Sequence, residues 1–140
     1  MPSRTKAREL AMQLMFLWDT NGEKDDALTD QVVRDAHVDD EERRLALQMA
    51  SDAWTARETS DAWIARLAPQ WPPRRQPGVD RSILRLAVWE LTATATPPKV
   101  VIDEAIELAK GFSTEQSPAF VNGVLDSVLR ETKALTDERR

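Results

Sequence analysis

The stretch PPKVVIDEAIELAKGFSTEQSPAFVNGVLD, from Pro97 to Asp126, contains two amphipathic helical patterns and the signals that separate them. Gly111 predicts the end of the first helix, because glycine is favoured just beyond a helix C-terminus. Ser117 followed by Pro118 predicts the N-cap and the first turn of the second helix. The apolar positions of the first helix recur at helical spacing at Ile102, Ile106 and Ala109. The stretch therefore predicts two helices joined by a short turn.

A glycine lies inside the second of these helices, in the sequence Asn122-Gly123. An interior glycine destabilises a helix by about 1 kcal/mol relative to alanine, so a compensating interaction is expected. We expect close backbone packing at Gly123.

The composition predicts a single all-α domain spanning residues 1–140. The chain has 41% hydrophobic residues, four glycines and no cysteine, and no segment approaches the ~20 apolar residues of a membrane span. The absence of cysteine excludes disulfide frameworks and thiolate chemistry. A basic N-terminus with no apolar signal-peptide core after it predicts a cytoplasmic protein.

Helix signals and breakers divide the rest of the chain. Pro69, Pro72, Pro73, Pro77 and Gly78 form the strongest breaker cluster and predict two helical halves, at about 3–68 and 79–134. The expected helices run from Ser3 or Arg4 to Trp18, from a cap at Thr29 or Asp30 to about Ala36, from Asp39–Glu42 to Leu67 with a bend at Thr59–Ser60, and from Val79 or Asp80 to Pro97.

The net charge of −5 argues against nucleic-acid binding, but the charge is unevenly distributed. Residues 19–42 hold ten acidic side chains against Lys24 and Arg34, a local balance of −8. Basic residues gather in two other places, at residues 4–8 and 74–85.

Two features are candidates for RNA contacts. Arg4, Lys6 and Arg8 fall in a first helical turn, where the helix dipole disfavours cations, so they predict a phosphate-binding patch; an ordinary solvated helix start is the alternative. Phe120, close to Gln116 and Ser117, offers a ring for an unstacked base, although a core phenylalanine has the same spacing.

The sequence offers little support for catalysis. Glu104 and Glu107 lie three apart on one helix, but no nucleophile or histidine completes a site, and an exposed charged face explains them better. His37 is the only histidine, which is too few for a metal centre of the usual ligands. No phosphate-binding glycine motif is present. We therefore expect no enzyme activity, no metal and no cofactor.

Three stretches carry a family resemblance: SRTKARELAMQLMF at residues 3–16, VDRSILRLAVWEL at 79–91, and the opening stretch at 97–126. Together they resemble the NusB family of bacterial transcription antitermination factors. The resemblance implies an all-α bundle of about seven helices in two packed sub-bundles. It also implies that Trp71, eight residues before the VDR motif, anchors the loop between the halves.

The resemblance further implies a scaffold that binds boxA-type single-stranded RNA of ribosomal RNA leaders together with NusE, a small-subunit ribosomal protein, and acts on transcribing RNA polymerase. Thr5 interrupts the basic run, and Gln116 stands where family members often carry an acidic residue. The implied RNA-binding residues are Arg4, Lys6, Arg8, Arg85, Gln116, Ser117 and Phe120, and the implied NusE-binding residues are Asp80 and Arg81.

Two alternatives remain open at this point. The chain can instead be a helical homodimeric interaction module that binds no RNA, which its acidic total and its five tryptophans would permit. It also resembles the NusB-like domain that precedes certain ribosomal-RNA cytosine methyltransferases, although no cofactor-binding domain is present in these 140 residues.

Overall fold

The computed structural model describes residues 4–138, with side chains described for residues 4–135. Within that range the chain forms seven α-helices, one short 3₁₀ helix (Pro73–Arg75) and no strand, which confirms the predicted all-α fold. The helices are α1 (Arg4–Asn21), α2 (Asp26–Asp35), α3 (Asp40–Thr55), α4 (Arg57–Leu67), α5 (Gly78–Ala93), α6 (Pro98–Phe112) and α7 (Ser117–Glu138).

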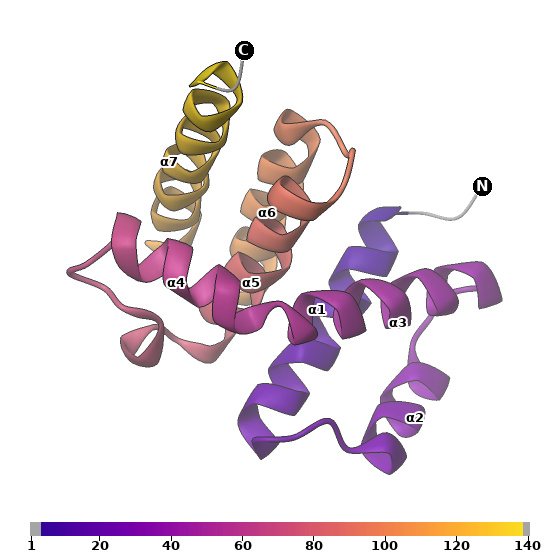
Figure 1. Ribbon diagram of the computed structural model, residues 1–140. Helices are drawn as coiled ribbons and strands as arrows, with labels where there is room; N and C mark the ends of the chain where they lie inside the picture. The colour runs from indigo at the N-terminus through magenta and orange to yellow at the C-terminus, as the bar shows by residue number, and fades with distance from the viewer. Residues whose placement is uncertain (1–3, 139–140) are drawn as a thin grey trace.

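The helices form two groups, with α1, α2 and α3 on one side and α4 to α7 on the other (Figure 1). Helix α5 is central, because it packs against α1, α3, α4, α6 and α7. Helix α4 precedes the proline-rich loop, yet it packs mainly on α5 and α7 and only lightly on α3. The boundary between the two packed groups therefore falls between α3 and α4, and the proline-rich loop reverses the chain inside the second group.

The start of α2 differs from the sequence prediction. Asp25 is the N-cap, and its carboxylate accepts a hydrogen bond from the Leu28 amide at 3.0 Å. Thr29 is buried one turn into the helix, where its hydroxyl accepts a hydrogen bond from Trp18 Nε1 at 2.8 Å. The predicted cap at Thr29 or Asp30 is wrong, because several acceptable cap residues follow one another and the contact with Trp18 selects among them.

The predicted long third helix is two helices. Its start is as expected: Asp39 and Glu42 form a reciprocal capping box at the first turn of α3. The interruption lies at Ala56, the residue between α3 and α4, and not at Thr59–Ser60. Ser60 is buried within α4, and alanine carries no local breaking signal, so only the packing of α4 on α5 reveals the bend.

Two glycines also behave differently from expectation. Helix α6 continues through Gly111 to Phe112 and is capped by Ser113. Gly123 is exposed within α7, and a Cβ atom built on it would meet nothing within 4 Å. The prediction of close backbone packing at Gly123 is therefore wrong. A glycine beside open space in a helix requires another explanation.

The hydrophobic core runs through both groups of helices. Trp18 of α1 is fully buried, with its ring edge-to-face on Trp54 at 5.7 Å between centroids. No helix among the described residues is long and apolar enough to cross a membrane. The residues buried along α1 and α7 include Leu10, Leu14, Met15, Val121, Leu125 and Val128.

Candidate nucleic-acid interface

Arg8 points into the protein. Its guanidinium donates to Glu90 at 2.8 and 2.7 Å, and only 3% of either residue is exposed. The hydrogen bond to Glu90 raises the pKa of Arg8 above its ordinary value, although burial acts in the opposite direction. Arg8 therefore joins α1 to α5. Arg8 lies on the same buried face of α1 as Met12 and Met15, but this spacing alone identifies no partner for a buried arginine.

Arg4 and Lys6 are exposed and lie on different sides of α1. Arg4 borders a shallow hollow of about 500 Å³ beside the α5–α6 loop, and Lys6 borders another of about 400 Å³ beside His37. Between them, the Thr5 hydroxyl donates to Glu104 at 2.6 Å. The amino end of α1 thus presents two separated cations in place of the continuous three-residue patch expected from the sequence.

Asp80 is also buried, with 3% of the residue exposed. Its carboxylate accepts hydrogen bonds from the Ser113 hydroxyl at 2.5 Å and from the Ser117 hydroxyl at 2.9 Å. The Ser117 hydroxyl in turn accepts a hydrogen bond from the Thr114 amide at 3.2 Å. Asp80 and Ser117 therefore hold the α6–α7 turn against the first turn of α5, and neither is placed to contact a partner directly.

Arg81 and Arg85 extend from α5 into a largely buried ionic network. Arg81 donates to Asp19 at 2.7 and 2.9 Å, and Arg85 bridges Asp19 at 3.0 Å and Asp61 at 2.7 Å. Burial would lower the pKa of Arg85, but its hydrogen bonds and charge interactions with Asp61 and Asp19 raise it overall. The network ties α1 and α4 to α5.

Arg81 also fixes the proline-rich loop, because it donates to the carbonyl oxygens of Pro73 at 2.7 Å and Gln76 at 3.1 Å. Arg85 is only 8% exposed, so the structure gives it a supporting position and not a surface one.

Gln116 and Phe120 remain on the surface, at the start of α7. Gln116 is exposed and Phe120 half-buried. They border an apolar pocket of about 450 Å³, whose wall also includes Trp71, Pro77 and Thr114. Since the turn beneath is held by Asp80, these two side chains are presented from a fixed base, which suits recognition of a flat ligand such as a nucleobase.

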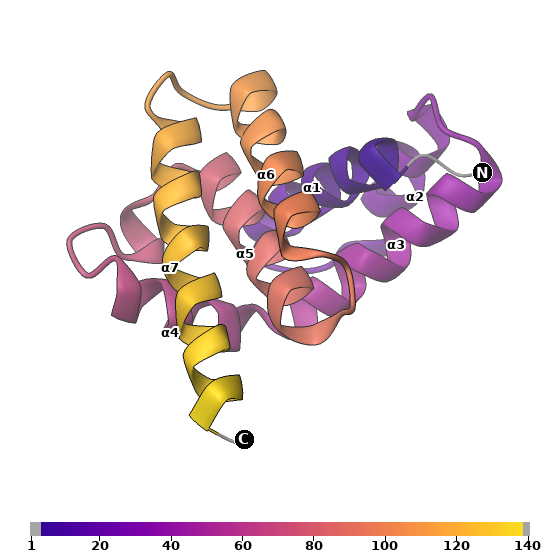
Figure 2. The same cartoon turned by 90° about the horizontal axis from the view of Figure 1, so that it is seen from above.

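The two predicted RNA-binding regions are not adjacent. Figure 2 shows the amino end of α1 and the start of α7 on either side of α6. The structure thus brings Gln116, Ser117, Phe120 and Asp80 together, and leaves Arg4 and Lys6 at a second place.

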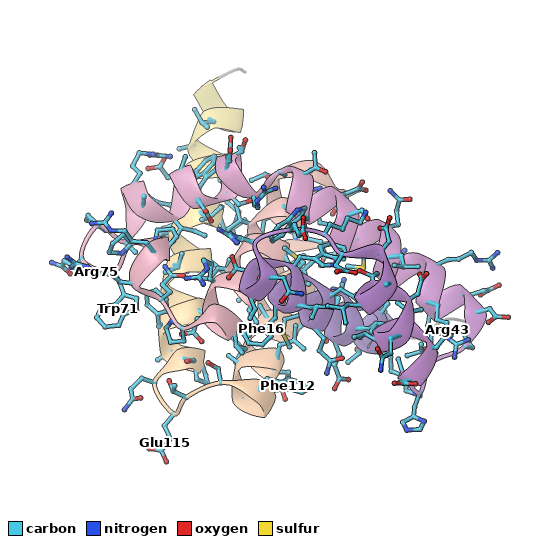
Figure 3. The ribbon with its side chains drawn as sticks, turned by 90° about the horizontal axis from the view of Figure 1, so that it is seen from below. Phe16, Arg43, Trp71, Arg75, Phe112 and Glu115 are labelled. Carbon is cyan, nitrogen blue, oxygen red and sulfur yellow. The ribbon has the colours of Figure 1, made fainter. Side chains whose placement is uncertain are left out.

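Sequence reasoning missed an exposed apolar surface. Phe16 and Phe112 are 40% and 41% exposed and appear on one face in Figure 3. Phe16 lies over the first turn of α5, since a Cβ atom on Gly78 would come within 2.9 Å of its ring. Phe112 precedes Ser113, whose hydroxyl donates a hydrogen bond to Asp80 in that same first turn of α5. In the sequence, Phe16 falls outside the helical row of apolar positions on α1, and this spacing was the available signal for an exposed ring.

Comparison with known proteins supports one assignment. The sequence profile of the NusB family matches residues 5–130. Transcription antitermination protein NusB of Symbiobacterium thermophilum is 42% identical over 140 residues, covering 94% of this chain and 92% of that protein.

Two solved structures have a similar fold. T. maritima NusB superposes with a TM-score of 0.82 at 31% identity, covering 94% of each chain. The structure of antitermination factors NusB and NusE in complex with dsRNA superposes with a TM-score of 0.82 at 28% identity, covering 91% of this chain and 96% of that one. The chain belongs to the NusB family of transcription antitermination proteins.

Proposed function

We propose that this protein is a cytoplasmic, non-catalytic antitermination scaffold that binds boxA-type single-stranded RNA of ribosomal RNA leaders together with NusE, and acts with them on transcribing RNA polymerase. The observation that carries the proposal is the α6–α7 turn. Asp80 holds it from below through Ser113 and Ser117, and it presents Gln116 and Phe120 beside an apolar pocket. A ring held on a fixed base stacks on an unpaired base with little loss of entropy.

The distribution of charge supports RNA binding by an acidic protein. Most of the acidic segment 19–42 belongs to α2 and the start of α3, on the opposite side of the molecule from α7 (Figure 1). Asp19 is paired with arginines, and Glu42 is held in the capping box. The negative charge of α2 therefore lies away from the α6–α7 turn, whereas at the amino end of α1 Lys6 lies beside residues 36–38 of the acidic segment and Arg4 lies beside the α5–α6 loop.

For NusE we propose the surface formed by Phe16 and Phe112. Aromatic side chains exposed on a folded monomer are typical of protein interfaces. Asp80 and Arg81 support this surface from inside, because they hold the first turn of α5 and the α6–α7 turn in place. A partner that adds its own contacts to the same RNA increases the affinity without a large basic face on this chain.

A titration tests the proposal. A fluorescent boxA-like single-stranded RNA is titrated with the protein, with purified NusE, and with both, across a salt series. We expect the pair to bind more tightly than either protein alone, Phe120→Ala to weaken binding by roughly 10-fold, and Phe16→Ala with Phe112→Ala to remove the gain from NusE. Equal affinity with and without NusE, or no RNA binding by the pair, would contradict the proposal.

A second candidate function is favoured by the same exposed phenylalanines, which could join two copies of this chain into a homodimer that binds no RNA. Light scattering separates the accounts. A stable dimer that persists with RNA present and is lost in the Phe16→Ala, Phe112→Ala variant supports the homodimer, whereas a monomer that shifts to higher mass with NusE and RNA supports the scaffold.

A further inference from the structure

The proline-rich loop carries an exposed tryptophan. Trp71 is 49% exposed. All five tryptophans lie in the described part of the chain, and the other four are buried or half-buried. The sequence resemblance implies a ring that anchors this loop. In the structure the backbone does the anchoring, since the Trp71 amide donates to the Ala68 carbonyl at 3.0 Å and its own carbonyl accepts from Gln76 Nε2 at 2.9 Å. Nearly half of the Trp71 surface remains accessible to a ligand.

The loop around Trp71 is rigid for an exposed segment. Pro73–Arg75 forms a 3₁₀ turn, and the guanidinium of Arg81 binds the carbonyl oxygens of Pro73 and Gln76 from the protein side. Prolines on both sides of this turn restrict the backbone further. An aromatic ring on a fixed loop loses little entropy when a ligand stacks on it.

Trp71 and Phe120 both line two hollows. One, of about 450 Å³, is the pocket at Gln116 already described. The other, of about 500 Å³, is mainly apolar and is lined by Trp71, Phe120 and residues of the α4 end and of α7, including Gly123. Because a Cβ atom on Gly123 would meet nothing, the glycine leaves the floor of the second hollow open. Both hollows are of the size that small-molecule sites occupy in proteins, about 300–1,000 Å³.

Two free cations follow Trp71 in the chain. Arg74 and Arg75 are exposed and form no ion pair or side-chain hydrogen bond with the described residues, unlike Arg81 and Arg85. Figure 3 shows Arg75 and Trp71 side by side at the same edge of the molecule. Unpaired arginines beside an exposed ring match the two parts of a single-stranded nucleotide, its phosphate and its base.

We infer that Trp71, Arg74 and Arg75 form a second nucleotide-binding site, which continues the RNA surface from the start of α7 across the proline-rich loop. One unstacked base lies in each hollow, against Trp71 and Phe120, and the neighbouring phosphates bind Arg74 and Arg75. This inference rests on the proposed RNA-binding function and extends it to residues outside the basic amino end and the start of α7. A peptide partner is the less suitable occupant, since the hollows offer mainly ring faces and apolar walls, and the two unpaired cations follow Trp71 on the same loop.

The test compares three variants for binding to the boxA-like single-stranded RNA by fluorescence anisotropy, in the presence of NusE and across a salt series. Trp71→Ala removes the ring, Trp71→Phe keeps a smaller one, and the pair Arg74→Gln, Arg75→Gln removes two charges. The pair Arg34→Gln, Arg44→Gln is the matched control, because it removes the same charge from exposed positions on α2 and α3. Circular dichroism melting confirms that each variant is folded.

We expect Trp71→Ala to weaken RNA binding by roughly 10-fold or more with an unchanged salt slope, and Trp71→Phe to recover most of the affinity. We expect Arg74→Gln, Arg75→Gln to reduce the salt slope by about 1.4, which corresponds to two phosphate contacts on a single strand, and the α2/α3 control to leave it unchanged. An RNA carrying 2-aminopurine should show fluorescence quenching that depends on Trp71.

Three outcomes would overturn the inference. RNA affinity unaffected by Trp71→Ala, with the parent protein binding normally, rejects this site and leaves the proposed function standing. Equal salt slopes for both double variants assign Arg74 and Arg75 no phosphate contact. If Trp71→Ala binds RNA with full affinity but binds NusE more weakly, the surface around Trp71 binds a protein partner and not RNA. If the parent protein binds no RNA, the proposed function itself fails.

Discussion

Arg8 and Glu90 are 82 positions apart in the chain and form a two-bond pair at 2.8 and 2.7 Å in the interior, with Glu104 at 4.0 Å from the same guanidinium. The pair connects the first helix to the central one. Of the three cations at the amino end of α1, Arg8 therefore stabilises the fold, and only Arg4 and Lys6 face solvent.

Replacing Arg8 with Ala should lower the free energy of unfolding by about 3 kcal/mol, because Glu90 would be left buried without its partner. Urea denaturation measures this loss, and Arg4→Ala, at an exposed position, should change stability by less than about 0.5 kcal/mol. The double change Arg8→Met, Glu90→Leu should restore most of the stability. A fully stable Arg8→Ala protein would contradict the buried pair. Since the pKa of Arg8 is raised on folding, its contribution is present below its unfolded pKa and lost only as the pH rises through the folded value.

The pair Arg4→Ala, Lys6→Ala should weaken binding of single-stranded RNA and reduce its salt slope by about 1.4. The reason is that both side chains are exposed and carry positive charge at the amino end of α1, which attracts phosphates. Anisotropy titrations at several salt concentrations give the slope. An unchanged slope would remove the amino end of α1 from the RNA surface.

Asp80→Ala should lower stability by roughly 1–3 kcal/mol, because the hydroxyls of Ser113 and Ser117 lose their acceptor in a buried place. The same change should weaken RNA binding, since Gln116 and Phe120 are carried by the turn that Asp80 holds. Ser113→Ala is the milder control and should lose about 1 kcal/mol. An Asp80→Ala protein with parental RNA affinity would show that this turn has no part in recognition.

Gly123→Ala should raise the free energy of unfolding by about 0.5–1 kcal/mol, because a methyl group there meets no atom and alanine favours the helix. Gly111→Ala is a matched control, also in open space and also helical. If the hollow over Gly123 receives a base, only Gly123→Ala should lower RNA affinity, by a few-fold. Identical RNA affinity for the two variants would mean that this glycine serves no ligand.

Thr29→Val should destabilise the protein by roughly 1–3 kcal/mol, because the two side chains have the same shape but valine leaves the buried Trp18 N–H without an acceptor. Thermal or urea unfolding measures the change. Asp30→Ala, at the neighbouring exposed position, should have little effect on stability. A larger loss of stability for Asp30→Ala than for Thr29→Val would contradict the role given to Thr29.

Local signals predicted the helices well where they act alone. The acidic residues at Asp39–Glu42 predicted the start of α3, which begins with a capping box of Asp39 and Glu42. Pro97 was expected to end α5, but that helix already ends at Ala93, and Pro98 begins α6. The bend at Ala56 and the start of α2 were missed. Alanine gives no sign of a break, and α2 has several equivalent caps, so packing on α5 and on Trp18 makes the choice.

The direction of the charged side chains was the least predictable feature of the candidate site. Arg8, Arg85 and Asp80 look like surface charges on amphipathic helices, and their partners Glu90, Asp61 and Ser117 lie 82, 24 and 37 positions away. No local pattern reveals such a partner. Gln116 and Phe120 were placed correctly at the start of a helix, but their pocket needs Trp71 and Pro77 from another segment.

The sequence by itself determined that the chain is helical and where most of its helices begin, because capping, helical periodicity and proline act over a few neighbouring residues. It also carried the family motifs. The tertiary structure alone decided which cations face inward, which aromatic rings stay exposed, and that an interior glycine borders open space. Each of these depends on a burial partner, or on the absence of one, from a distant part of the chain.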